Sequence, residues 1–158
     1  MNKILLSIFL ISSLAINAET IASCGALKGV SYYPYLGVFS DKENSGWQDD
    51  GISGGKTTLT FDGTGFDILF IDFFDEINSS IANGAEIKLM MVGEKSYSLL
   101  SSYENSTLEI YTFWKNKDEE FRFSLTQVKD GAAFFKKQTV LVGECTYVKF
   151  DWLEKLLS

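Results

Sequence analysis

Apolar and polar residues alternate along several short segments of the chain. In residues 121–126, Phe121, Phe123 and Leu125 share one face of an extended segment, and the residues between them are polar. A period of two is typical of a β-strand with one buried face, so we predict a strand here. Further segments rich in β-branched and aromatic residues predict strands at 29–33, 56–61, 66–73, 86–91, 96–100, 108–114 and 139–150.

Clusters of Gly, Asn, Asp and Ser separate these segments. Residues 62–65 (Asp-Gly-Thr-Gly) and Asn83-Gly84 are turn signals, because glycine adopts positive φ at no steric cost. Short connections predict that strands neighbouring in sequence pair antiparallel. About eight or nine strands in such a meander predict an all-β fold. We expect an up-and-down, lipocalin-like barrel, since a closed barrel leaves no strand edge exposed; a Greek-key sandwich is the alternative.

Residues 1–18 have the pattern of a secretory signal peptide. Lys3 provides a positive start, an apolar run follows, and Ala18 offers a small residue for cleavage. The apolar run is shorter than the roughly 20 residues that a helix needs to span a bilayer. We therefore expect a single β domain over residues 19–158, exported to a periplasm or secreted, with no integral membrane segment.

Charge and composition restrict the function. The chain contains no histidine, which excludes imidazole bases and histidine-ligated metal sites. Its formal net charge is −7, and removal of Lys3 with the signal peptide makes the remainder more acidic. An acidic protein repels phosphate backbones, so we do not expect a nucleic-acid partner. Nothing in the sequence indicates a cofactor, and we expect a monomer.

Two cysteines, Cys24 and Cys145, lie near the two ends of the expected domain. Cysteines in an oxidising compartment usually pair, so we predict a disulfide between them. In the alternative, residues 21–24 (Ile-Ala-Ser-Cys) resemble a bacterial lipobox, Cys24 carries a lipid and anchors the protein, and Cys145 stays unpaired.

Residues 40–55 form the longest segment without a strand pattern. They contain four acids, four glycines and one aromatic residue, and long loops often carry function. Trp47 in this segment, together with Tyr32, Tyr33 and Tyr35, is a candidate aromatic platform for a small apolar or sugar-like ligand at the barrel mouth. In the alternative interpretation these rings only pack the core and its rim.

The acids of the 40–55 segment are also candidate calcium ligands. Asp41, Glu43 and Asp49 follow part of the register of an EF-hand loop. The position that should carry a bidentate glutamate is Ile52, however, and no flanking helices are predicted. A solvated acidic loop is the simpler interpretation.

The sequence leaves three functions open. The one we expect is an exported, non-enzymatic binding module that takes a small ligand in the barrel mouth. The alternative is a protein-interaction or inhibitor module that acts through the 40–55 loop and an exposed sheet face. The least supported is a hydrolase, which needs two carboxylates facing each other across a cleft. Its candidate residues are Asp49, Asp50, Asp72, Asp75 and Glu76.

Overall fold

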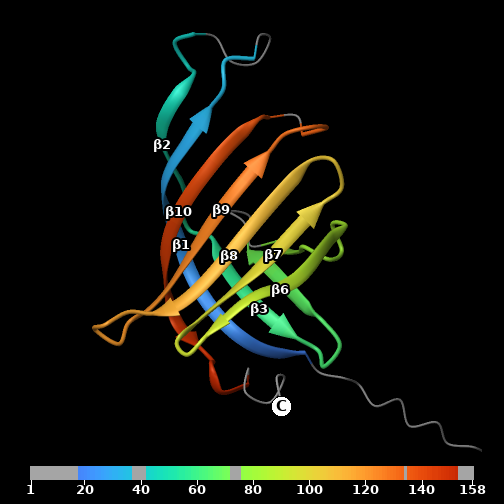
Figure 1. Cartoon of the computed structure of the whole chain (residues 1–158), viewed down its shortest axis with the longest axis vertical. Coiled ribbons are helices and arrows are strands. Elements are labelled where there is room, and N and C mark those ends of the chain that lie inside the picture. Colours follow the sequence, from blue (N-terminus) through green and yellow to red (C-terminus); the bar gives the residue numbers. More distant parts are fainter. Residues whose placement is uncertain (1–17, 37–41, 72–75, 134, 153–158) are drawn as a thin grey trace, which may run out of the picture.

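Ten β-strands build one antiparallel sheet in the computed structural model, which describes residues 18–36, 42–71, 76–133 and 135–152. The strands are β1 (Glu19–Tyr33), β2 (Gly46–Ile52), β3 (Lys56–Phe61), β4 (Phe66–Ile71), β5 (Ile77–Ser79), β6 (Ala85–Gly93), β7 (Ser96–Tyr103), β8 (Thr107–Lys115), β9 (Phe121–Lys129) and β10 (Lys137–Val148). The sheet curls into a half-barrel (Figure 1). The all-β prediction is therefore confirmed. The expected signal peptide lies, apart from Ala18, outside the described residues.

The order of the strands across the sheet is β5-β4-β3-β1-β10-β9-β8-β7-β6. Strands β2 and β3 both pair with β1 and run in the same direction, so they share one position: β3 pairs with the first part of β1, and β2 with the last part. Starting at β1 and going round the curled sheet through β2 and β3 to β5, and then from β6 to β10, the strands occur in the same order as in the sequence. This is the antiparallel meander that the sequence predicts.

The curled sheet has two edges, β5 and β6, with no ladder between them in the part of the chain that the structure describes. The turn residue Ser80 connects the two sides. Its amide donates a hydrogen bond to the Ile68 carbonyl on β4 (3.0 Å), and its carbonyl accepts one from the Ala85 amide on β6 (2.9 Å). We call this place the seam.

Strand β2 falls within residues 40–55, so the prediction of a continuous loop there is wrong. Most of β2 is exposed on both faces, and the strand therefore lacks the alternation that reveals a half-buried strand. Figure 1 shows the paired ends of β1 and β2 projecting beyond the neighbouring strands, at the end of the half-barrel away from the C-terminus.

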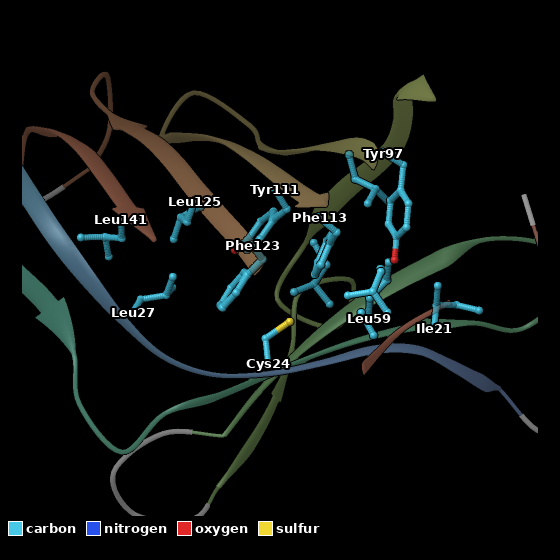
Figure 2. Packing of buried hydrophobic residues seen from close by; sticks show 14 of the residues in the cluster. Ile21, Cys24, Leu27, Leu59, Tyr97, Tyr111, Phe113, Phe123, Leu125 and Leu141 are labelled. Atoms are coloured by element: carbon cyan, nitrogen blue, oxygen red, sulfur yellow. The ribbon is translucent and has the colours of Figure 1, made fainter. Parts of the chain in front are cut away.

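Inward-facing rings of β7, β8 and β9 form an aromatic floor at one end of the half-barrel. Tyr97, Phe113 and Phe123 lie opposite one another in the register, with ring centroids 5.2 and 5.9 Å apart. All three are at most 1% exposed. Figure 2 shows Tyr97 and Phe113 pointing across the interior towards Leu59, and Phe123 pointing towards Cys24.

The chain after β10 closes this end. The Trp152 ring packs on Phe61, Phe66 and Tyr97 at centroid distances between 5.3 and 6.0 Å. Its indole N–H donates a 2.8 Å hydrogen bond to the Lys149 carbonyl, so the polar edge of the ring is satisfied while the rest is buried. At the opposite end, β1 and β2 form the projecting hairpin, and no described residue plugs the interior in this way. We call this end the open end.

A disulfide joins Cys24 on β1 to Cys145 on β10, as predicted. The two residues are partners in the β1–β10 ladder, so the bond ties the first and last strands of the meander. A disulfide-bonded Cys24 has no thiol for lipid attachment, and a buried disulfide is compatible with an exported protein. In the described residues, no helix has the length and apolar character needed to cross a bilayer.

Candidate ligand-binding site

Five consecutive strands each place a polar side chain at one level of the inner face, on the open-end side of the core. Cross-strand pairing runs from Ser101 on β7 through β8, β9 and β10 to Ser31 on β1. We call this row the polar belt; its members are Ser101 (0% exposed), Glu109 (6%), Gln127 (9%), Thr139 (2%) and Ser31 (0%). The next level towards the floor consists of Leu99, Tyr111, Leu125 and Leu141. Buried polar groups cost stability unless they are hydrogen-bonded, so a whole row of them requires an explanation.

One end of the belt is a satisfied hydrogen-bond network. The Ser31 hydroxyl donates to Asp50 on β2 (2.5 Å) and lies 2.6 Å from the Thr139 hydroxyl, which must then donate to Ser31. The Lys137 ammonium also reaches Asp50, at 2.8 Å. Burial pushes the pKa of Asp50 upwards, but hydrogen bonds from Lys137, Ser31 and the Gly51 amide outweigh it and hold the pKa below the ordinary 3.8.

The substitution Asp50→Asn tests this network through pH. We expect the variant to lose about 1–2 kcal/mol of unfolding free energy at pH 7, because charged hydrogen bonds are removed. A carboxyl group with a lowered folded-state pKa stabilises the fold above its ordinary pKa and loses that effect as pH falls. The gap between wild type and variant in urea unfolding should therefore persist down to about pH 5 and shrink below about pH 4. A gap that is independent of pH would contradict the assignment.

Glu109 occupies the middle of the belt. Its two carboxylate oxygens accept hydrogen bonds from the Gln127 side-chain amide (2.6 Å) and from the Tyr111 hydroxyl (2.8 Å). Burial raises the pKa of Tyr111 well above its ordinary value, and the neighbouring Glu109 charge adds to this, so Tyr111 stays a hydrogen-bond donor. Within the described residues, no ion pair involves Glu109.

The other end of the belt reaches the seam, where two buried hydroxyls, those of Ser80 and Ser101, make no hydrogen bond of good geometry. Tyr103 lies beside both. Its partner across the ladder is Ala85, which also holds the Ser80 carbonyl. Burial raises the pKa of Tyr103, while hydrogen bonding of its hydroxyl with Ser80 and Ser101 acts in the opposite direction.

Two serines of β7 provide a matched test of the unsatisfied belt. Ser101 faces inward and makes no hydrogen bond of good geometry, whereas Ser98 faces outward and shares a 2.9 Å hydrogen bond with the Thr112 hydroxyl. We expect Ser101→Ala to raise the unfolding free energy by about 1 kcal/mol and Ser98→Ala to lower it by about 1 kcal/mol. Urea unfolding at pH 7 measures both. Equal losses in the two variants would show that the Ser101 hydroxyl is satisfied.

The structure separates the four predicted aromatic residues. Tyr32 (37% exposed) and Trp47 (67%) are ladder partners and form an edge contact at 5.4 Å on the convex face of the projecting hairpin. Tyr33 lies on the other face, where the Lys137 ammonium is 5.9 Å from its ring centroid. Tyr35 follows the strand and is 63% exposed. Only Tyr33 therefore lies next to the inner network.

The predicted acids do not gather in the described part of the chain. Glu43 and Asp49 are exposed, and Asp41 lies outside the described residues. No group of three or more Asp, Glu, Cys or His side chains is placed to hold a metal ion among the residues described. Asp49 and Asp50 are consecutive in β2 and point to opposite faces. The remaining hydrolase candidates are Glu76, which is exposed, and Asp72 and Asp75, which lie outside the described residues.

A hollow of about 240 Å³ lies at the rim of the open end. It is lined by Pro34, Leu36, Val128, Lys129, Asp130, Lys136, Lys137 and Gln138. Its lining combines the ladder partners Lys129 and Lys137, one level above the belt, with the outward-facing partners Val128 and Gln138, so the hollow lies at the rim between the two faces and contains no belt residue. A second hollow, of about 570 Å³, opens on the convex face beside the disulfide, where Arg122 is paired with Glu144.

Sequence reasoning missed the belt because it treated each strand separately. A signal was present: Glu109 is in phase with Tyr111 and Phe113, and Gln127 is in phase with Phe123 and Leu125. A polar residue in the inward phase of a strand indicates a special interior position.

Comparison with protein-family models, curated proteins and solved structures finds no match, so the evidence for function comes from this site alone.

Proposed function

We propose that the chain is an exported, non-enzymatic binding protein that takes a small polar ligand at its open end. The observation that carries this proposal is the polar belt, a continuous row of buried hydrogen-bonding side chains across five strands. Small-ligand sites in barrels are typically found at the mouth, with few polar groups that fix the ligand's orientation. The signal-peptide pattern and the disulfide support export.

The proposal favours a polar ligand over an apolar one. The aromatic floor is filled by its own rings, which are at most 1% exposed, so it offers an apolar ligand little surface. The belt offers hydroxyls that are poorly hydrogen-bonded and a carboxylate instead. A ligand with hydrogen-bonding groups, sugar-like in that respect, gains from these groups, while an apolar ligand would cover them at a cost.

Native mass spectrometry of the protein purified from its own compartment tests the proposal. Gln127 and Gln138 supply a matched pair on adjacent strands, the first in the belt and the second exposed on the convex face. We expect a co-purifying mass below about 1 kDa with wild type and Gln138→Leu, and its loss with Gln127→Leu. Circular dichroism confirms that both variants are folded. The bare chain alone in all three samples would contradict the proposal.

One observation favours the protein-interaction alternative. The convex face of β8, β9, β10, β1 and β2 carries large apolar side chains that are each more than a third exposed: Tyr32, Val30, Trp47, Leu108, Ile110, Val128, Val140 and Val142. Extended apolar patches mark interaction surfaces. In the same mass-spectrometry experiment, a second protein chain that is lost with Trp47→Ala and retained with Gln127→Leu would support this function in place of the first.

A further inference from the structure

We propose that the ligand carries a single carboxylate, which binds to Lys129 in the hollow at the rim of the open end. This inference rests on the proposed function and adds the chemical class of one ligand group. It starts from two lysines one level above the polar belt, Lys129 on β9 and Lys137 on β10. Each lies two residues from a belt member on its own strand, Gln127 or Thr139, so both start from the inner face.

The two lysines face each other across the ladder, which is unfavourable unless an anion lies near them. Lys129 and Lys137 are direct partners in the pairing of β9 with β10. Facing Cβ atoms in such a ladder are about 5 Å apart, and like charges placed in this way destabilise a sheet. A negatively charged ligand group beside the two ammonium groups would offset this repulsion.

Lys129 is the lysine of this pair that lacks a counterion. The Lys137 ammonium is held by Asp50 at 2.8 Å. The neighbouring Lys136 is held by Asp130 at 2.6 Å. Lys129 is only partly exposed, yet it makes no ion pair in the described part of the chain. One positive charge is therefore left for a ligand, in a chain whose formal net charge is −7.

The hollow gives a ligand group room beside these charges. Lys129, Lys136 and Lys137 all belong to the lining of this space of about 240 Å³. Pockets for whole drug-sized ligands typically measure about 300–1,000 Å³, so the hollow suits one end of a ligand. Pro34 and Leu36 add apolar surface to its wall. Such a wall fits an anionic group that is attached to carbon.

The balance of charges selects a carboxylate among anions. A carboxylate carries one negative charge, which matches the one lysine without a counterion, and both of its oxygens accept hydrogen bonds. Each lysine ammonium has three N–H donors, so Lys129 can donate to one oxygen and Lys137 to the other while it keeps its bond to Asp50. A dianion such as sulfate would bring a second charge with no free lysine to balance it.

The test uses n-butyrate, with n-butanol as the neutral probe and sulfate as the dianion. NMR of protein with ¹³C-labelled lysines, at pH 7 and constant ionic strength, is expected to show saturable shifts of the Lys129 and Lys137 side-chain signals with butyrate. Sulfate should bind more weakly, and butanol should leave both signals in place. We expect Lys129→Gln to weaken butyrate binding about tenfold, as observed at Lys137, because a charged hydrogen bond is lost.

Lys28 provides the matched control for this substitution. It is an exposed lysine on the convex face of β1, opposite Val142, and it makes no ion pair in the residues described. Lys28→Gln changes the net charge by the same amount, and we expect it to leave butyrate binding unchanged. Equal losses in Lys28→Gln and Lys129→Gln would show a non-specific effect of net charge.

Other results would also overturn the inference. Equal binding of butanol would show that charge plays no part, and tighter binding of sulfate would show that the hollow does not select a single charge. No shift with butyrate would contradict the site directly. A co-purifying small molecule without a carboxylate would overturn this inference and leave the proposed function standing. If nothing co-purifies, the proposed function itself fails.

Discussion

Replacement of both Cys24 and Cys145 by alanine is expected to lower the free energy of unfolding by about 4–5 kcal/mol. The disulfide spans 121 residues of sequence and ties the two strands that complete the meander. In the chain-entropy model, most of its effect comes from restricting the unfolded chain, and the effect grows with loop length. Urea unfolding of the purified proteins measures the difference.

Reduction provides the control for the disulfide variant. Wild type in excess reductant should unfold at nearly the same urea concentration as the variant, and reductant should not change the variant at all. A larger m-value is expected in both cases, because an unfolded chain without the cross-link exposes more surface. A stability loss below about 1 kcal/mol would contradict the view that the bond closes the fold.

The second large effect is expected at Gly29, in the part of β1 that lies between β2 and β10. A Cβ atom there would collide with the Val140 carbonyl oxygen and lie 2.9 Å from the Leu141 Cα, both of which belong to the backbone of β10. Backbone cannot move aside as a side chain can. We expect Gly29→Ala to cost at least about 3 kcal/mol of unfolding free energy, measured by urea or thermal unfolding.

Gly65 is the matched control for this substitution. It lies in the turn between β3 and β4, and nothing is within 4 Å of the position that its Cβ would occupy. Gly65→Ala should be neutral or slightly stabilising, since alanine restricts the unfolded chain. Similar losses at Gly29 and Gly65 would show that the close approach of β1 and β10 is not the cause.

The strands that could be predicted from the sequence are those with one buried face. β9 follows its alternation from Phe121 onwards, and the turns at 62–65 and 83–84 fall where glycine and asparagine indicate them, with Gly63 and Gly84 at positive φ. The first part of β1 escaped prediction because Ile21 to Cys24 are all buried and the register shifts around Cys24. A strand without period two gives no pattern to detect.

The candidate site was harder to predict because it is a property of the register between strands. Ser101, Glu109 and Gln127 are ordinary polar residues in three separate segments, and only the pairing of β7, β8 and β9 places them in one row. A shift of one residue in either ladder would turn one of them to the convex face. The contribution of Ser80 also depends on the fold, since the two edges of the curled sheet meet at the seam.

In the belt, the requirements of stability and of ligand binding oppose each other. Ser80 and Ser101 leave buried hydroxyls without a hydrogen bond of good geometry, which lowers the stability of the fold. Such costs are concentrated at functional sites in natural proteins. If the belt binds the ligand, substitutions that remove these hydroxyls should stabilise the ligand-free protein and weaken ligand binding at the same time. A purely structural role would not couple the two effects with opposite sign.

The chain's three glutamines allow the most direct test of the ligand site. Gln127 lies in the belt, Gln48 lies on the same face of the sheet opposite Ser31, and Gln138 lies on the convex face, so the Gln127 and Gln138 side-chain amide signals in NMR report on two separate surfaces. During titration with a panel of monosaccharides, we expect a saturable shift of the Gln127 amide while that of Gln138 stays in place. An unmoved Gln127 signal throughout the panel, or shifts confined to Gln138, would contradict the proposed site.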